Sequence, residues 1–337
     1  MNQKTLRERC AARGMEYCCF ATPLAHERKI SLSRPGPARE SVNCRSKKGC
    51  FMKTPQILFD TCAQDWNEAL PIGNGRLGGM IYGKPYTELI QLNEDSVWYG
   101  GPMERNNPSA RENLSKIREL IFAGRIAEAQ ELCTFALTGV PEEQRHYEPL
   151  GNLYLLFEGK SDEVSSYTRF LDIENAFAEV SYTINGITMR RQYIASYPDG
   201  VIGIRLTSNR EGSLSFHTQL TRGEPTWDYS PYQEQVYRHP GFNSNVDSCV
   251  AAGENTVLMT AQCGGKSAVE VACAVSVIAE GGEVSLLGNN LIVKGADSAT
   301  ILLAAETTYR SANPQEVVMK RLSDASRLCW EDLLQKH

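Results

Sequence analysis

The segment QLNEDSVWYGGP, residues 91–102, places two carboxylates and two aromatic rings within six positions. Glu94 and Asp95 are adjacent, so on a strand their side chains would point to opposite faces of the sheet. Hydrolysis of a glycosidic bond needs two carboxyl groups that face each other across the bond, which this pair alone cannot supply. Trp98 and Tyr99 suit stacking on a sugar ring, and they equally suit a buried core. The segment provides three candidate substrate-binding residues, Asn93, Glu94 and Trp98.

A second candidate segment is GEPTWDYSPYQEQVYRHPGFN, residues 223–243. It is long and aromatic, and it lacks the alternation of a strand. Long loops in compact domains are often functional, whereas a surface loop that packs on its own side chains has the same composition. Both interpretations stay open.

Other catalytic and metal-binding patterns are missing from the sequence. The five histidines are isolated and form no H-x-x-x-H motif, and no G-x-S-x-G motif occurs. The glycine-rich stretch EALPIGNGRLGGMIYG, residues 68–83, is no phosphate loop, because Arg76 and Leu77 stand where Lys and Ser or Thr would be needed. We therefore predict a glycine-shaped turn beside a strand, and we predict no catalytic residue, no metal site and no cofactor.

The 337-residue chain changes in character after residue 51. Residues 1–51 carry 11 Lys and Arg against 4 Asp and Glu, whereas the remainder carries 24 against 36. The acidic charge of residues 52–337 argues against binding to nucleic acid. The sequence contains no run of 18 apolar residues, so it predicts no membrane span. We predict that residues 1–51 are a disordered or non-native leader. Cysteines scattered among apolar residues favour a reduced, cytoplasmic protein, with secretion unlikely.

The body of the chain has the pattern of many short strands. Apolar or alternating runs bounded by turn residues occur at 87–92, 152–157, 201–206, 213–220, 255–261, 269–278 and 300–306. In AEVSYTINGITMRRQYIAS, Asn185-Gly186 separates two alternating runs and predicts a two-residue hairpin. We expect a mainly β fold, a large antiparallel β-sandwich with a short helical insertion and a C-terminal linker helix.

Helical patterns occupy residues 107–137 and 313–337. Gly124 is expected to divide the first into two short helices. The second begins with the Asn313 cap and Pro314, and its apolar stripe comprises Val318, Leu322, Ala325, Cys329 and Leu333. We expect a single helix of about 22 residues whose stripe stays partly exposed, which would favour aggregation or a dimer.

Several of these segments, in the same order, resemble the N-terminal part of family 95 glycoside hydrolases, the inverting 1,2-α-L-fucosidases. The resemblance rests on the ordered motifs EALPIGNGRLGGMIYG, IQLNEDSVWYGGP, NPSARENLSKIRELIFAG, YEPLGNLYLLF, YTRFLDIENAFAEVSYTINGITMRRQYIASYPDGVIGIRL and ADSATILLAAETTYR. It covers residues 57–337.

The leader 1–51 has no counterpart in the family. For the rest of the chain, the resemblance implies a sandwich domain at 52–310 and, at 311–337, the start of a helical linker to an (α/α)₆ barrel. In the family that barrel carries the catalytic groups, so we expect this chain to be inactive alone and to support and partly wall the barrel's active site. The implied partners are a fucosylated oligosaccharide and the barrel in cis, with neither nucleic acid nor membrane. A free-standing carbohydrate-binding module is the alternative.

Overall fold

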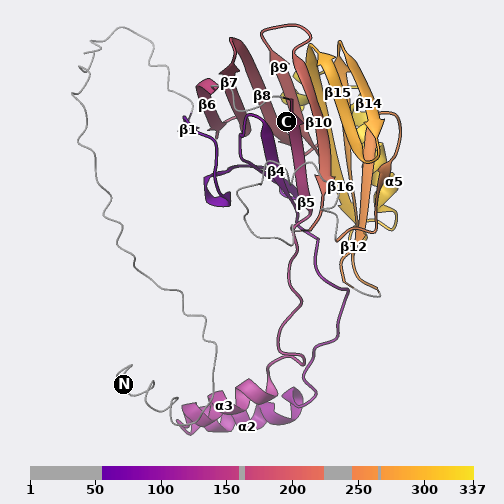
Figure 1. Ribbon diagram of the computed structural model, residues 1–337. Helices are drawn as coiled ribbons and strands as arrows, with labels where there is room; N and C mark the ends of the chain where they lie inside the picture. Colours follow the sequence, from indigo (N-terminus) through magenta and orange to yellow (C-terminus); the bar gives the residue numbers. More distant parts are fainter. Residues whose placement is uncertain (1–54, 159–163, 224–244, 265–266) are drawn as a thin grey trace, which may run out of the picture. The chain divides into compact units, whose positions relative to one another are not determined.

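The computed structural model describes residues 55–158, 164–223, 245–264 and 267–337, all within the compact unit Lys53–His337. Two antiparallel sheets form a sandwich (Figure 1). The first sheet has the order β1 (Gln56–Phe59), β6 (Val164–Asp172), β7 (Phe177–Ile184), β8 (Ile187–Ser196), β9 (Val201–Ser208), β16 (Ser298–Thr307), β13 (Glu270–Glu280), β12 (Thr256–Gln262), β11 (Ser248–Ala251). The second has the order β14 (Glu283–Leu287), β15 (Asn290–Ala296), β10 (Leu214–Thr221), β5 (Gly151–Phe157), β4 (Thr87–Glu94), β3 (Leu77–Ile81), β2 (Leu70–Gly73). The predicted fold class is confirmed.

The seven predicted strand runs correspond to β4, β5, β9, β10, β12, β13 and β16. The predicted hairpin is formed by β7 and β8, with Ile184 opposite Ile187. Its two turn residues, Asn185 and Gly186, have φ values of 50° and 77°. Positive φ at both central positions belongs to a type I′ turn, whose twist matches that of the flanking strands.

The glycine-rich stretch is a structural turn, as expected. It joins β2 to β3 through residues 74–76, where Gly75 has φ of 89° and the Asn74 side chain accepts hydrogen bonds from the backbone N–H groups of Arg76 and Leu77. Gly79 faces the core, and a Cβ there would lie 2.9 Å from Cγ2 of Ile90. The glycines therefore serve the turn and the close packing of the sheets.

A buried ion pair joins the two sheets inside the sandwich. Glu88 of β4 lies 3.0 Å from Nη1 of Arg191 on β8, and both side chains are buried. The Glu88 carboxylate also accepts hydrogen bonds from the Tyr193 hydroxyl and the Gly83 backbone N–H. Burial raises the pKa of Glu88, while Arg191 and the hydrogen bonds oppose that rise. This pair connects β4 to β8 across the sandwich.

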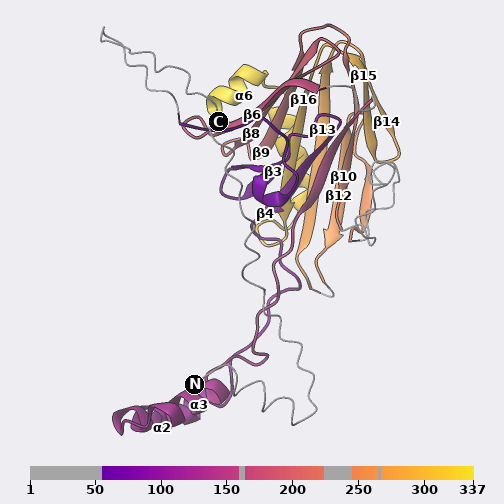
Figure 2. The ribbon, with the colours of Figure 1, turned by 60° about the vertical axis from the view of Figure 1, so that its left-hand side comes forward.

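The C-terminal segment differs from the prediction in two ways. It forms two helices, α5 (Pro314–Ala325) and α6 (Trp330–Lys336), which cover the outer face of the nine-stranded sheet (Figure 2). Val318, Leu322 and Leu333 are buried against strand residues such as Leu302, so the expectation of a partly exposed stripe was wrong for them. The turn at residues 326–329 rotates α6 onto the sheet and leaves Cys329 exposed.

The predicted helical insertion consists of α2 (Ala110–Phe122) and α3 (Ile126–Ala136), separated at Gly124 as expected, where φ is 72°. The two helices pack against each other.

The predicted leader 1–51 and nearly all of the candidate loop 223–243 lie outside the described residues. Among the helices that the structure describes, none has the length and apolar character needed to cross a membrane. A 3₁₀ helix, Trp66–Glu68, precedes β2 in the chain.

Candidate functional site

Glu94 and Asp95 converge, contrary to the expectation that they diverge. The strand β4 ends at Glu94, and Asp95 lies in the following turn, so the alternation of strand side chains no longer applies there. Both carboxylates bind one guanidinium: Nη1 of Arg310 lies 2.9 Å from Glu94, and Nη2 lies 2.7 Å from Asp95. A fork of this kind fixes the end of β4 against the segment that follows β16.

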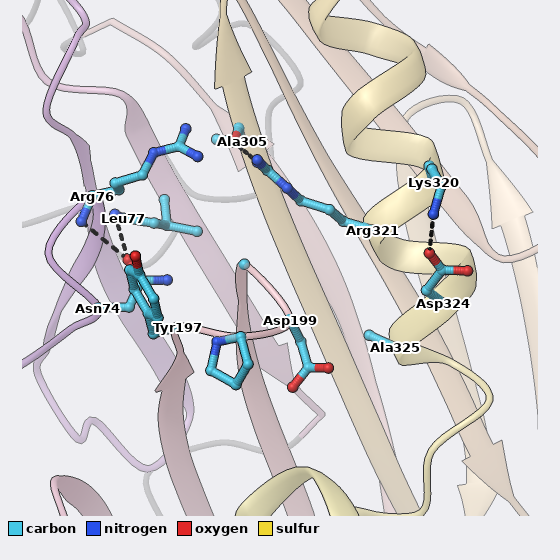
Figure 3. A pocket seen from close by; sticks show the side chains of 12 residues that line it. Asn74, Arg76, Leu77, Tyr197, Asp199, Ala305, Lys320, Arg321, Asp324 and Ala325 are labelled. Atoms are coloured by element: carbon cyan, nitrogen blue, oxygen red, sulfur yellow. Dashed lines mark hydrogen bonds and ion pairs between the residues drawn. The ribbon is translucent and has the colours of Figure 1, made fainter. Parts of the chain in front are cut away.

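The Glu94 carboxylate belongs to a wider ion network. Glu94 is 0% exposed and also binds Arg76 at 3.2 Å. Arg76 in turn binds Glu306 at 2.9 Å, and Glu306 binds Arg321 of α5 at 2.8 Å. The negative charges of the three carboxylates therefore balance the positive charges of the three guanidinium groups. In Figure 3, Arg76 and Arg321 approach from facing walls of a pocket of about 540 Å³.

The described residues that line this pocket provide no acid and base for hydrolysis. Its two carboxylates, Asp199 and Asp324, are both in ion pairs: Asp199 with Lys336 at 2.8 Å and Asp324 with Lys320 at 2.5 Å, the latter drawn in Figure 3. The hydrogen bond from Lys320 lowers the pKa of Asp324, whereas a general acid at neutral pH needs a raised pKa. Glu88 has a raised pKa but is sealed between the sheets.

Trp98 borders a different cleft, of about 620 Å³, which we call the loop cleft. Its Trp98 ring packs edge-on against Tyr147, with ring centroids 5.1 Å apart, and Tyr99 stacks on His146 at 4.8 Å. Trp98 is 38% exposed, so its ring is neither core nor fully free. The loop cleft is also lined by Tyr309, which follows β16. This aromatic, partly polar cleft can hold a ring-shaped ligand.

Asn93 lies on the other side of Tyr147. The Tyr147 hydroxyl is 2.6 Å from Oδ1 of Asn93 and 2.7 Å from the backbone oxygen of Glu94. Burial raises the pKa of Tyr147, so its hydroxyl stays protonated. Asn93 lines a third pocket, of about 670 Å³, on the outer face of the seven-stranded sheet. The three predicted residues are neighbours, yet Asn93 and Trp98 line separate cavities and Glu94 is enclosed by the ion network.

Reasoning from single segments missed several residues around these cavities. Tyr147 begins the motif YEPLGNLYLLF, and Tyr309 and Arg310 end ADSATILLAAETTYR. These polar and aromatic residues stand directly beside strand runs, where loops carry function, and that position was the available signal. Among the described residues, no group of three or more His, Cys, Asp or Glu side chains is placed to hold a metal ion.

These features define a class: a β-sandwich domain whose described part has surface cavities and holds the carboxylates beside them in ion pairs. The chain belongs to the family described as glycosyl hydrolase family 65, N-terminal domain, whose model matches residues 57–312. The resemblance to the N-terminal domain of family 95 fucosidases is confirmed by this match together with the fucosidase relatives that follow.

Three relatives carry fucosidase names. "Alpha-L-fucosidase 2" from Arabidopsis thaliana is 29% identical over 315 residues, which is 84% of this chain and 35% of that protein. "Probable alpha-fucosidase A" from Aspergillus niger is 34% identical over 47% of this chain and 20% of its own length. The Aspergillus oryzae protein of the same name is 32% identical over 52% of this chain and 25% of its length. The chain thus spans about a third or less of the relatives that it matches.

Proposed function

We propose that this chain supports and partly walls the active site of an inverting α-L-fucosidase that acts on terminal α-1,2-linked fucose. The fucosidase names of three relatives support the substrate class. The single observation that carries the role of a wall is the loop cleft, in which Trp98 is partly exposed and held by Tyr147. The partners under this proposal are a fucosylated oligosaccharide and a helical barrel in cis, with no metal or organic cofactor. The cytoplasmic location expected from the cysteines belongs to the same proposal.

The chemistry explains why a wall and not a catalytic centre is proposed. Inversion needs an acid and a base about 6.5–9.5 Å apart, with room for a water molecule between them. In the described part of the chain, the carboxylates beside the cavities are held in ion pairs, as for Glu94, Asp95 and Asp324. The acid and the base would then come from the barrel. An aromatic wall would position the sugar by stacking on its apolar face.

Fucose release from 2′-fucosyllactose tests the proposal. The purified chain alone should release none above the no-enzyme blank, whereas a complete relative should be active. In that relative, an Ala at the position of Trp98 should raise KM or lower kcat while the melting temperature stays unchanged. The matched control is Ala at the position of Tyr197, an exposed aromatic residue beside the ion-network pocket.

Two results would contradict the proposal. Turnover by the chain alone, in a preparation free of host fucosidase, would show that residues 52–337 contain an active site. Unfolding of the Trp98 variant, with normal kinetics in the surviving fraction, would show that Trp98 only packs.

A further inference from the structure

We propose that the hollow on the outer face of the seven-stranded sheet is an accessory binding site for a neutral oligosaccharide. This sheet-face hollow encloses about 670 Å³, within the range of about 300–1,000 Å³ that is typical of small-ligand sites. It is separate from the loop cleft, since Trp98 does not line it. The proposal concerns binding alone and needs neither a barrel nor hydrolysis.

The floor of the hollow is shaped by the strand register. Gly78 on β3 lies opposite Asn93 on β4, and because Gly78 has no side chain, the sheet surface there stays low. Two positions further along the strands, on the same face, Met80, Gln91 and Asn152 lie side by side across β3, β4 and β5. The floor therefore combines an apolar strip with a row of side-chain amides. A pyranose ring has this same division between an apolar face and a polar rim.

An aromatic side chain borders this floor. Trp66, at the start of the 3₁₀ helix that precedes β2, lines the hollow and is 56% exposed. Among the described residues, Trp66 belongs to none of the buried apolar clusters, and its indole offers a flat surface for a ring-shaped ligand. Tyr147 lines the hollow from the loop side.

A hydrogen bond orients the Gln91 amide. The Tyr82 hydroxyl lies 2.8 Å from Oε1 of Gln91 and donates to it, which turns the amide nitrogen of Gln91 away from Tyr82. An amide nitrogen carries two N–H donors, and sugar hydroxyl oxygens accept from such groups. This contact holds the Gln91 side chain in one orientation before a ligand arrives, which reduces the ordering cost of binding.

The charged residues of the hollow favour a neutral ligand. Glu148 binds Arg222 through one carboxylate oxygen and lies 3.3 Å from Nε2 of His146 through the other. The acidic and basic groups at the rim are therefore engaged with each other. A phosphorylated or sulfated ligand would have to break the pair of Glu148 and Arg222, whereas a neutral saccharide leaves it intact.

Titration of the chain with 2′-fucosyllactose, lactose and cellotetraose tests the proposal, by ligand-observed NMR and calorimetry at concentrations up to about 10 mM, so that millimolar binding is detected. At least one saccharide should bind. Trp66→Ala should raise the Kd of that saccharide at least about tenfold. Trp66→Phe keeps an aromatic ring and should raise the Kd by a smaller factor. Asn152→Asp, which replaces an amide donor by an acceptor, should weaken binding about threefold or more.

Two aromatic variants serve as matched controls. Tyr197→Ala removes another exposed aromatic ring, at the ion-network pocket, and should leave Kd unchanged within about twofold. Trp98→Ala tests the loop cleft. Thermal denaturation of every variant confirms that it is folded. Absence of binding by all three saccharides overturns the proposal. Binding that is lost in Trp98→Ala and retained in Trp66→Ala also overturns it, and assigns the saccharide to the loop cleft of the proposed function. Failure of the fucosidase proposal alone would leave the Trp66 result untouched.

Discussion

Replacing Glu94 by Gln separates a structural role of this carboxylate from contact with substrate. Oε2 accepts hydrogen bonds from the backbone N–H and the hydroxyl of Ser96, and Oε1 accepts from Arg76 and Arg310. An amide has one accepting oxygen, so Glu94→Gln turns an N–H₂ group toward either Ser96 or the guanidinium groups. It also changes the ion network from three charges of each sign to an excess of one positive charge.

The structure sets the expected cost. Removing one partner of a fully buried ion pair costs about 3–5 kcal/mol. Here Arg76 and Arg310 are 27% and 30% exposed at their side chains, and each keeps a second carboxylate, on Glu306 and Asp95. Solvent and the remaining partners reduce the penalty, so we expect a loss of about 2–3 kcal/mol. For a domain of this size that loss lowers the melting temperature by about 4–12 °C.

Thermal denaturation followed by circular dichroism measures this change. Asp95→Asn, at the exposed end of the same network, is the control and should cost less than about 1 kcal/mol. The double variant Glu94→Gln with Arg76→Met should be less destabilised than the sum of the two single changes, by about 0.5–3 kcal/mol. An unchanged melting temperature for Glu94→Gln, combined with lost activity of the corresponding variant of a complete relative, would refute the structural role and assign Glu94 to the substrate.

Further predictions concern the scaffold. Trp330→Ala should cost about 3–5 kcal/mol in chemical denaturation, because its buried ring packs between α6 and the nine-stranded sheet, and a loss under about 1 kcal/mol would mean that α6 is loosely attached. Gly79→Ala should reduce the free energy of unfolding by about 1–3 kcal/mol, since the added Cβ would clash with Ile90. Gly75→Ala adds a Cβ that meets no neighbour, so it tests the cost of the positive φ alone. Gly186→Val should destabilise the β7–β8 hairpin through its φ of 77°, and equal stability would argue against the type I′ turn. Deletion of residues 1–51 should shift the melting temperature by less than about 2 °C.

The sequence predicted the strands because their information is local. Alternation and turn residues placed the β7–β8 hairpin at Asn185-Gly186, and Gly124 marked the break between α2 and α3. The position of the C-terminal helices was missed, although a signal was present. Residues 271–275 and 301–305, within the predicted runs 269–278 and 300–306, are continuous apolar stretches, which is typical of strands that are covered on both faces. The outward residues Ala274 and Leu302 lie under α5 and α6.

The candidate site was harder to predict, because its contacts join distant parts of the chain. Arg310 and Glu306 lie more than 200 residues after their partners Glu94 and Arg76, and no spacing rule connects positions so far apart. The aromatic character of the segment 91–102 was readable. That Tyr147 divides Trp98 from Asn93 depends on the path of two separate loops.

The position of β16 has a consequence for how the protein is made. This strand ends at Thr307, yet it lies in the middle of the nine-stranded sheet, between β9 and β13. While the ribosome is still producing residues 209–297, the edge of β9 that will pair with β16 has no partner strand. After β13 has been made, its edge toward β16 is also unpaired until β16 follows. Such unpaired apolar edges are templates for wrong pairing, and contacts over so long a stretch of chain form slowly. We expect the nascent domain to depend on chaperones until residue 307 has emerged, and the sheet to close from both sides onto its last strand.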